Sequence, residues 1–120
     1  MKILIVDDSR VMRTIVIRTL RQAGFHAHPV SEAADGLVAL AAIEADPPGL
    51  VLSDWNMPEM SGMELLRTLR SRSNNVPFGF VTSEGSDQMR GQAEQAGALF
   101  LIAKPFTAET FTEALAGVLA

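Results

Sequence analysis

Three aspartates directly follow short apolar runs of the sequence. Asp7 and Asp8 follow residues 2–6, and Asp54 follows residues 50–53. If the runs are parallel strands, their carboxyl ends meet at one edge of a sheet, where α/β proteins bind ligands. Carboxylates gathered there repel one another and raise at least one pKa, so a hard cation with oxygen ligands is their natural partner. We therefore expect a Mg²⁺ site, in which Mn²⁺ would be an acceptable substitute.

Two further apolar runs end in residues that complement these carboxylates. Thr82-Ser83 follows one run and Lys104-Pro105 the other. A carboxylate can attack a phosphoryl group, while a lysine charge and a threonine hydroxyl stabilise the transferred oxygens. Each residue alone has a simpler interpretation, because aspartates often cap helices and single lysines are mostly solvated. Their convergence is what favours formation of an acyl phosphate.

Alternating strands and helices would position these residues. Apolar runs of four to six residues alternate with stretches of helical period, which is typical of repeated βα units around a parallel sheet. The expected strands are residues 2–6, 25–30, 50–53, 76–81 and 99–103. The fold class is therefore α/β, with the order βα repeated five times.

The second of these units has the weakest signals. Pro29 cannot donate to a central ladder, so the strand over residues 25–30 is placed at a sheet edge. Ser31 is expected to cap the following helix, which ends at residues 46–49, Asp-Pro-Pro-Gly. The apolar face of that helix is predicted to include Leu37 and Leu40.

The later helices have clearer boundaries. Ser61 and Glu64 have capping-box spacing, and Thr107 is expected to cap a last helix whose apolar stripe is Phe111, Leu115, Val118 and Leu119. The helix within residues 85–97 has few apolar anchors, namely Met89, Ala93 and Ala96. Such a helix packs weakly, which suits a switching surface but also describes any marginal helix.

Composition narrows the class of protein. The 120 residues suffice for one domain with its own core, and the absence of cysteine excludes disulfides and thiolate sites. A net charge of −4 argues against direct nucleic-acid binding. The amino-terminal apolar run is too short for a signal peptide or a membrane span, so we expect a cytoplasmic protein.

His26 and His28 form a surface pair rather than a metal site, because no third ligand is near.

Four spaced motifs resemble the receiver domains of bacterial two-component response regulators, among them the chemotaxis regulators. They are residues 3–9 (ILIVDDS), 52–62 (LSDWNMPEMSG), 81–84 (VTSE) and 104–106 (KPF). The resemblance spans essentially residues 1–120 as a single receiver domain. It implies a doubly wound, flavodoxin-like (βα)5 fold with a five-stranded parallel sheet of order 2-1-3-4-5 and helices on both faces.

The resemblance also implies a role for each acidic residue. Asp54 would be the phosphoacceptor. Asp8, Asp54 and the backbone carbonyl of Asn56 would bind Mg²⁺, and Asp7 would hold a metal-bound water. Asn56 and Glu84 match positions that flank the path of the hydrolytic water, so they would tune the lifetime of the phosphoryl group.

The same resemblance implies roles at the ends of the last two strands. Thr82, followed by Ser83, would bond the phosphoryl group and reorient on activation. Lys104 would pair with the phosphoryl group, and the Lys104-Pro105 bond would be cis. Family members that resemble the chemotaxis regulators carry Tyr or Phe where this chain has Leu101, so we expect backbone and helix displacement to replace an aromatic switch.

The expected function is a phosphorylatable signalling switch that catalyses only its own phosphorylation and dephosphorylation. Its implied partners are a sensor histidine kinase or phosphotransfer protein, small phosphodonors and a downstream protein target. It would be a monomer or a weak phosphorylation-dependent dimer.

Three alternative functions compete with that one. A flavodoxin-like cofactor binder is disfavoured because Asp7-Asp8 would repel a flavin phosphate. An aspartyl phosphatase or mutase would need a D-x-D arrangement after the first strand, which is missing. A degenerate receiver acting as a phosphorylation-independent interaction or dimerisation module is the remaining alternative.

Overall fold

The computed structural model describes residues 1–118, in which strands and helices alternate along the chain. The elements are β1 (Ile3–Val6), α1 (Arg10–Gln22), β2 (Val30–Ala33), α2 (Gly36–Ala45), β3 (Leu50–Ser53), α3 (Gly62–Ser71), β4 (Phe78–Thr82), α4 (Asp87–Ala96), β5 (Phe100–Ala103) and α5 (Ala108–Leu115). The predicted order of βα repeated five times is confirmed.

The strands form one parallel sheet of order β2-β1-β3-β4-β5 over the described residues, the flavodoxin-like order that the resemblance implies. Val6, the last residue of β1, pairs with Ala33 of β2 and Ser53 of β3. Thr82 of β4 pairs with Ala103 of β5. The residues that follow these strand ends therefore leave the sheet at the same edge.

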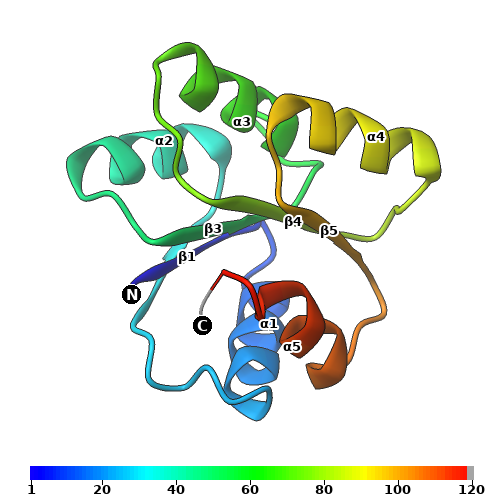
Figure 1. Cartoon of the computed structure of the whole chain (residues 1–120). Helices are drawn as coiled ribbons and strands as arrows, with labels where there is room; N and C mark the ends of the chain where they lie inside the picture. Colours follow the sequence, from blue (N-terminus) through cyan, green and yellow to red (C-terminus); the bar gives the residue numbers. More distant parts are fainter. Residues whose placement is uncertain (119–120) are drawn as a thin grey trace.

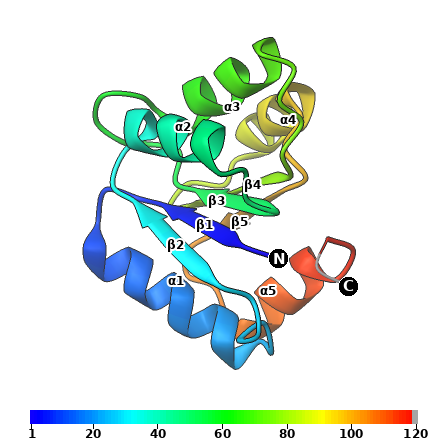
Figure 2. The ribbon, with the colours of Figure 1, turned by 90° about the vertical axis from the view of Figure 1, so that its left-hand side faces the viewer.

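Helices cover both faces of the sheet. Figure 1 shows α2, α3 and α4 above it and α1 and α5 below it, and the turned view in Figure 2 shows the same layers. Every residue of β1, β3 and β4 is buried. Strands covered on both sides have no polar face, which is why the sequence shows continuous apolar runs instead of alternation.

Hydroxyl and carboxylate side chains begin the helices. Ser61 accepts a hydrogen bond from the Glu64 N–H at 3.1 Å, and the Glu64 carboxylate accepts from the Ser61 N–H, so the predicted capping box is present. Thr107 caps α5 as predicted, accepting from the Thr110 N–H. These local bonds satisfy amide groups that the first helical turn leaves without partners.

The predicted positions of the second strand and of the cap of the second helix were wrong. The strand lies at Val30–Ala33, and Ser31 pairs with Leu4 within the sheet instead of capping α2. Asp35 is the cap, accepting from the Val38 N–H at 2.9 Å. Ser31 and Asp35 are both good capping residues, so the choice depends on which segment can pair with β1.

The predicted apolar face of α2 also needs correction. Leu37 is 48% exposed, whereas Ala39 and Ile43 are fully buried. Because α2 is apolar around most of its circumference, its sequence gives no direction to the core. Leu119, predicted on the stripe of α5, lies outside the described residues.

The remaining boundaries differ by one or two residues. β4 spans Phe78–Thr82 instead of 76–81, and β5 begins at Phe100 instead of Leu99, which is exposed. Ala93 is the one buried residue of α4, with Met89 and Ala96 packed at the edge of the core, as the sparse apolar pattern indicated. Within residues 1–118, the helices are all too short or too polar to cross a membrane.

Candidate functional site

Three carboxylates meet where β1 and β3 end. Asp7, Asp8 and Asp54 each offer an oxygen, and these oxygens lie within 4.8 Å of one another. Asp7 is buried, Asp54 is half-buried and Asp8 is exposed, so the cluster opens to solvent on one side. The central strands deliver these residues to one edge, as the strand register requires. The convergence predicted from sequence is therefore present.

Asp7 is held by several groups. Its Oδ1 accepts a hydrogen bond from the Ser9 N–H at 2.8 Å, and its Oδ2 lies 3.5 Å from the Lys104 Nζ. The Arg13 guanidinium donates to the Asp7 backbone carbonyl at 2.6 Å and also pairs with Glu32. With both carboxylate oxygens engaged, Asp7 orients Lys104 toward the site.

Asp54 is fixed by its backbone and by its neighbour. Its N–H donates to the Val6 carbonyl at 2.8 Å, and its Oδ1 accepts from the Trp55 N–H at 2.7 Å. Burial is the main reason that its pKa is raised above 3.8, with the Asp7 and Asp8 charges adding to it. The Lys104 charge and the Trp55 N–H oppose this rise in the pKa. Burial thus disfavours the charged form of Asp54, which a bound cation would stabilise.

Gly62 permits the tight turn below Asp54. A Cβ at Gly62 would lie 2.1 Å from the Asp54 carbonyl oxygen, and the Gly62 N–H donates to the Trp55 carbonyl at 2.8 Å. The Trp55 ring packs on Phe80, with centroids 4.8 Å apart. No role for Gly62 or Arg13 was predicted from the sequence. A glycine right after the Ser61 cap was the available signal for Gly62.

Thr82 and Lys104 lie at the ends of β4 and β5. Thr82 is fully buried, and its hydroxyl accepts from the Glu84 N–H at 3.4 Å. The Lys104 N–H donates to the Thr82 carbonyl at 2.8 Å, and the Lys104-Pro105 peptide bond is cis, as expected. Backbone and side-chain contacts thus hold the positively charged Lys104 beside the acidic cluster.

The other predicted site residues surround this centre. Asn56 is exposed on the loop after β3, two residues beyond Asp54. Ser83 and Glu84 are exposed at the start of the loop between β4 and α4. Leu101 is 7% exposed on β5, opposite Phe80 of β4, and its carbonyl accepts from Arg90 of α4 at 2.8 Å.

The donor set fits a small divalent cation. Three carboxylates face one lysine, so the cluster carries an excess of negative charge in a partly desolvated place. Oxygen ligands of this kind are those that Mg²⁺ and Mn²⁺ bind. An arrangement of a solvent-accessible carboxylate, a nearby lysine and a cation site has the components for accepting a phosphoryl group.

Comparison with known proteins decides the family. The response regulator receiver domain family matches residues 3–116 of the chain. The chain belongs to this family. The receiver domain is 43% identical over 117 residues to the chemotaxis protein CheY-3 of Vibrio cholerae, covering 96% of this chain and 88% of that protein. It is 41% identical over 115 residues to the chemotaxis protein CheY of Pseudomonas aeruginosa, covering 94% and 91%.

Solved structures agree with the sequence comparison. The receiver domain matches the crystal structure of Vibrio cholerae CheY4 with a TM-score of 0.83 and 36% identity, covering 98% of this chain and 97% of that one. The protein is therefore homologous to chemotaxis response regulators, and it is a signalling domain rather than a conventional enzyme. The degenerate module is not favoured.

Proposed function

We propose that this receiver domain accepts a phosphoryl group on Asp54 from a histidine kinase or phosphotransfer protein, in a Mg²⁺-dependent reaction. The observation that supports this most directly is the cluster of Asp7, Asp8 and Asp54, whose oxygens lie within 4.8 Å, with Lys104 at 3.5 Å from Asp7. Small phosphodonors such as acetyl phosphate would serve in the same way.

In the proposed transfer, a carboxylate oxygen of Asp54 attacks phosphorus and forms the P–O bond of an acyl phosphate. The bond from phosphorus to the donor nitrogen, or to the carboxylate oxygen of acetyl phosphate, breaks as the leaving group takes the electron pair. Because Trp55 donates to Oδ1 of Asp54, the other oxygen, Oδ2, is the nucleophile we assign. The reaction consumes no oxidant or reductant.

Asp8, Asp54 and the Asn56 carbonyl are the proposed Mg²⁺ ligands, and Asp7 would hold a water bound to the ion. A bound divalent cation offsets the negative charge that builds on the phosphoryl oxygens during transfer. Lys104 and the Thr82 hydroxyl are assigned to those same oxygens, as a point charge and a hydrogen-bond donor. Asn56 and Glu84 would set access for the water that hydrolyses the acyl phosphate.

The proposed output is a change in the partner-binding face. A phosphoryl group on Asp54 offers new acceptors to Thr82, whose hydroxyl now accepts from the Glu84 N–H at 3.4 Å. Drawing Thr82 away would release the loop over residues 83–86 and displace α4. Leu101 has no aromatic ring to rotate, so displacement of backbone and helix carries the signal, with Pro105 fixing the loop beyond Lys104.

The wider setting is part of the same proposal. Relatives at 41% and 43% identity are named chemotaxis proteins, which supports a role in chemotaxis for this receiver domain. We propose that it acts in the cytoplasm, as a monomer or a weak phosphorylation-dependent dimer, on a downstream protein target. Catalysis is confined to its own phosphorylation and dephosphorylation.

Trp55 offers a direct test, because it adjoins Asp54 and is the single tryptophan of the chain. Mg²⁺ should change its fluorescence saturably, and acetyl phosphate should change it again and add one phosphoryl mass. Asp54→Asn should abolish the second change and the adduct. A wild-type protein with neither a fluorescence change nor an adduct would contradict the proposal and support a phosphorylation-independent module.

A further inference from the structure

Away from the acidic site, a hollow lies between α3 and α4. It has a volume of about 330 Å³ and is lined by Arg67, Arg70, Gln92, Gln95 and Ala96. That volume falls at the lower end of the range of about 300–1,000 Å³ for small-molecule sites. The charged residues of this lining are both arginines, and the other polar residues are carboxamides. The walls therefore offer hydrogen-bond donors and positive charge.

Arg70 is anchored in place within this hollow. Its Nη1 donates to the Asn74 carbonyl at 2.9 Å and its Nη2 to the Gly97 carbonyl at 3.0 Å. Gly97 has φ +102°, and a Cβ there would lie 2.8 Å from the Arg70 Nε. The guanidinium thus occupies the space that a side chain at position 97 would fill. Its orientation is fixed before any ligand arrives, which lowers the entropic cost of binding.

Arg70 forms no ion pair in the part of the chain that the structure describes. Among residues 1–118, the ion pairs are Lys2–Asp46, Arg13–Glu32, Arg72–Glu44 and Lys104–Asp7, so neither Arg67 nor Arg70 is paired with a carboxylate. Partial burial lowers the pKa of Arg70 from its ordinary value. The two carbonyl partners take two of its five N–H groups and leave the others for a ligand.

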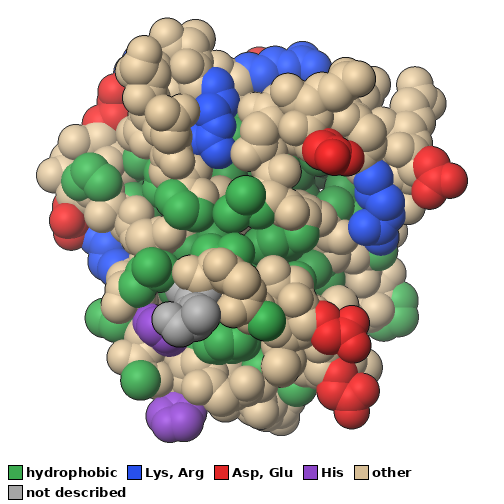
Figure 3. Space-filling view, viewed as in Figure 1, with side chains coloured by type: hydrophobic (Ala, Val, Ile, Leu, Met, Phe, Trp, Pro, Cys, Tyr) green, Lys and Arg blue, Asp and Glu red, His purple; other side chains and the backbone are tan. Residues whose placement is uncertain are grey.

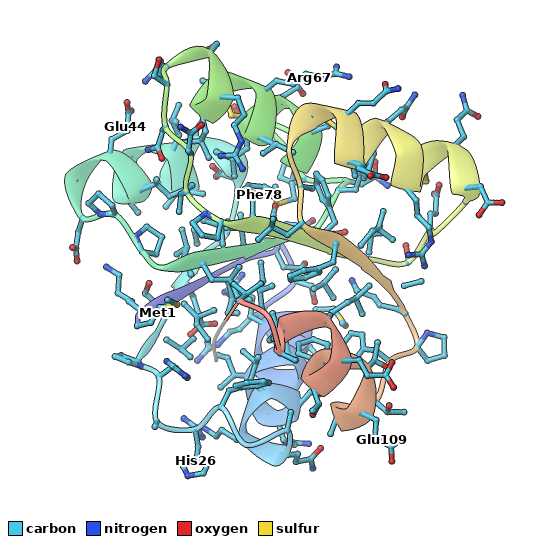
Figure 4. All side chains as sticks on the ribbon, in the orientation of Figure 1. Met1, His26, Glu44, Arg67, Phe78 and Glu109 are labelled. Atoms are coloured by element: carbon cyan, nitrogen blue, oxygen red, sulfur yellow. The ribbon has the colours of Figure 1, made fainter. Side chains whose placement is uncertain are left out.

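The surface around the hollow carries charges of both signs. Figure 4 shows Arg67 on α3 at the top of the molecule, and Figure 3 shows basic and acidic side chains over this helical layer. Glu94 of α4 lines a different hollow, together with Arg90 and Leu99. The α3–α4 hollow is thus a cationic site on a chain whose net charge is −4.

We propose that the α3–α4 hollow binds an anionic ligand that carries a carboxylate or phosphate group. Arg70 forms the fixed floor, Arg67 closes over the anion from the rim, and Gln92 and Gln95 donate from α4. Guanidinium groups bind both kinds of anion through paired N–H donors. The site does not depend on phosphorylation of Asp54. Since the hollow joins α3 to α4, a bound anion would tie these two helices together.

The test is an NMR titration of the full chain with inorganic phosphate and, separately, with citrate. A chelating resin removes divalent cations from the protein and buffers beforehand, because EDTA is itself a polycarboxylate, and ionic strength is held constant with sodium chloride. We expect saturable amide shifts at residues 67, 70, 92 and 95–97, with a Kd on the order of 1 mM. Stronger binding of phosphate or of citrate identifies which of the two anionic groups the hollow prefers.

Two variants should lower the affinity for the anion while leaving the hydrogen bonds of Arg70 intact. Arg67→Gln deletes a cation, and Gln92→Glu adds a negative charge without changing size. Each should weaken binding about tenfold, as expected for a loss of about 1.4 kcal/mol. Gln22→Glu on the exposed end of α1 makes the same change in charge elsewhere and should leave affinity within about twofold.

Two results would overturn the proposal. One is the absence of saturable shifts with both anions. The other is equal weakening by Gln92→Glu and Gln22→Glu, because the interaction would then reflect net charge rather than a site.

Discussion

Arg90 of α4 donates a hydrogen bond from Nη1 to the backbone carbonyl of Leu101 on β5, at 2.8 Å. The contact joins the helix to the edge strand at the residue where the family has an aromatic ring. Gly85 lies beside it, since a Cβ there would be 2.8 Å from the Ala103 Cβ and 3.5 Å from the Arg90 Nη2. The loop after β4, the helix α4 and the strand β5 therefore meet at one arginine.

Loss of this contact should loosen α4. Arg90→Met keeps the aliphatic stem but removes a charged donor, so the free energy of unfolding should fall by about 1–2 kcal/mol. Urea unfolding measures the loss, and amide hydrogen exchange should accelerate over residues 83–90. Arg18→Met, at an exposed position of α1, should change stability by less than about 0.5 kcal/mol. Equal effects of the two substitutions would show that the Arg90 contact contributes nothing.

Thr82 should be required for the response of this loop but not for the chemistry at Asp54. Thr82→Ala should still gain a phosphoryl adduct with acetyl phosphate and Mg²⁺, because the carboxylates remain. The phosphorylation-induced amide shifts over residues 83–90 and 100–103 should fall by at least about half, since the hydroxyl that links them to the phosphoryl group is gone. Thr82→Ser should restore them. If phosphorylated Thr82→Ala bound a downstream partner with wild-type affinity, the displacement hypothesis would be rejected.

Gly62 and Gly91 make a matched pair of helix glycines. A Cβ at Gly62 would lie 2.1 Å from the Asp54 carbonyl, so Gly62→Ala should cost about 1–3 kcal/mol of stability and alter Trp55 fluorescence. A Cβ at Gly91 meets nothing within 4 Å, and Gly91→Ala should stabilise the protein by about 0.5–1 kcal/mol. Thermal unfolding of both variants tests this. A neutral Gly62→Ala would mean that the turn below Asp54 relaxes freely.

Asp54→Asn should stabilise the metal-free protein at neutral pH. The folded-state pKa of Asp54 is raised above 3.8, mainly by burial, so the folded protein binds its proton more tightly than the unfolded chain. The contribution of Asp54 to the free energy of unfolding is therefore fully present below pH 3.8, the ordinary pKa of the carboxyl group. It is lost as the pH rises through the folded-state pKa. Asparagine does not titrate and removes the repulsion from Asp7 and Asp8.

The matching measurement is urea unfolding in EDTA at a series of pH values, from about pH 7 down toward the ordinary carboxyl pKa. The Asn variant should exceed wild type most at about pH 7, and the difference should shrink as pH falls toward the ordinary carboxyl pKa. Asp46→Asn, at an exposed position paired with Lys2, is the control and should show no such gain. A difference that grew on acidification would reverse the sign and refute the account.

Much of this protein can be predicted from its sequence, because its signals are local. Strands buried on both faces need continuous apolar runs, so β1, β3 and β4 can be recognised in the sequence. The residues that follow these strands must then share one edge of a parallel sheet. The capping box of Ser61 and Glu64 closes within a single turn. The acidic cluster was predictable for the same reason, since each aspartate directly follows its strand.

Tertiary structure decided what depends on contacts between distant segments. β2 is an edge strand with a weak pattern, and its position at Val30–Ala33 follows from pairing with β1, which made Asp35 rather than Ser31 the cap. The buried face of α2 was set by packing, because its sequence is apolar on most sides. The Arg90–Leu101 bond and the Arg70–Gly97 contact join residues 11 and 27 positions apart. No periodicity reports such pairs, because only the folded sheet brings α3, α4 and β5 within reach of one another.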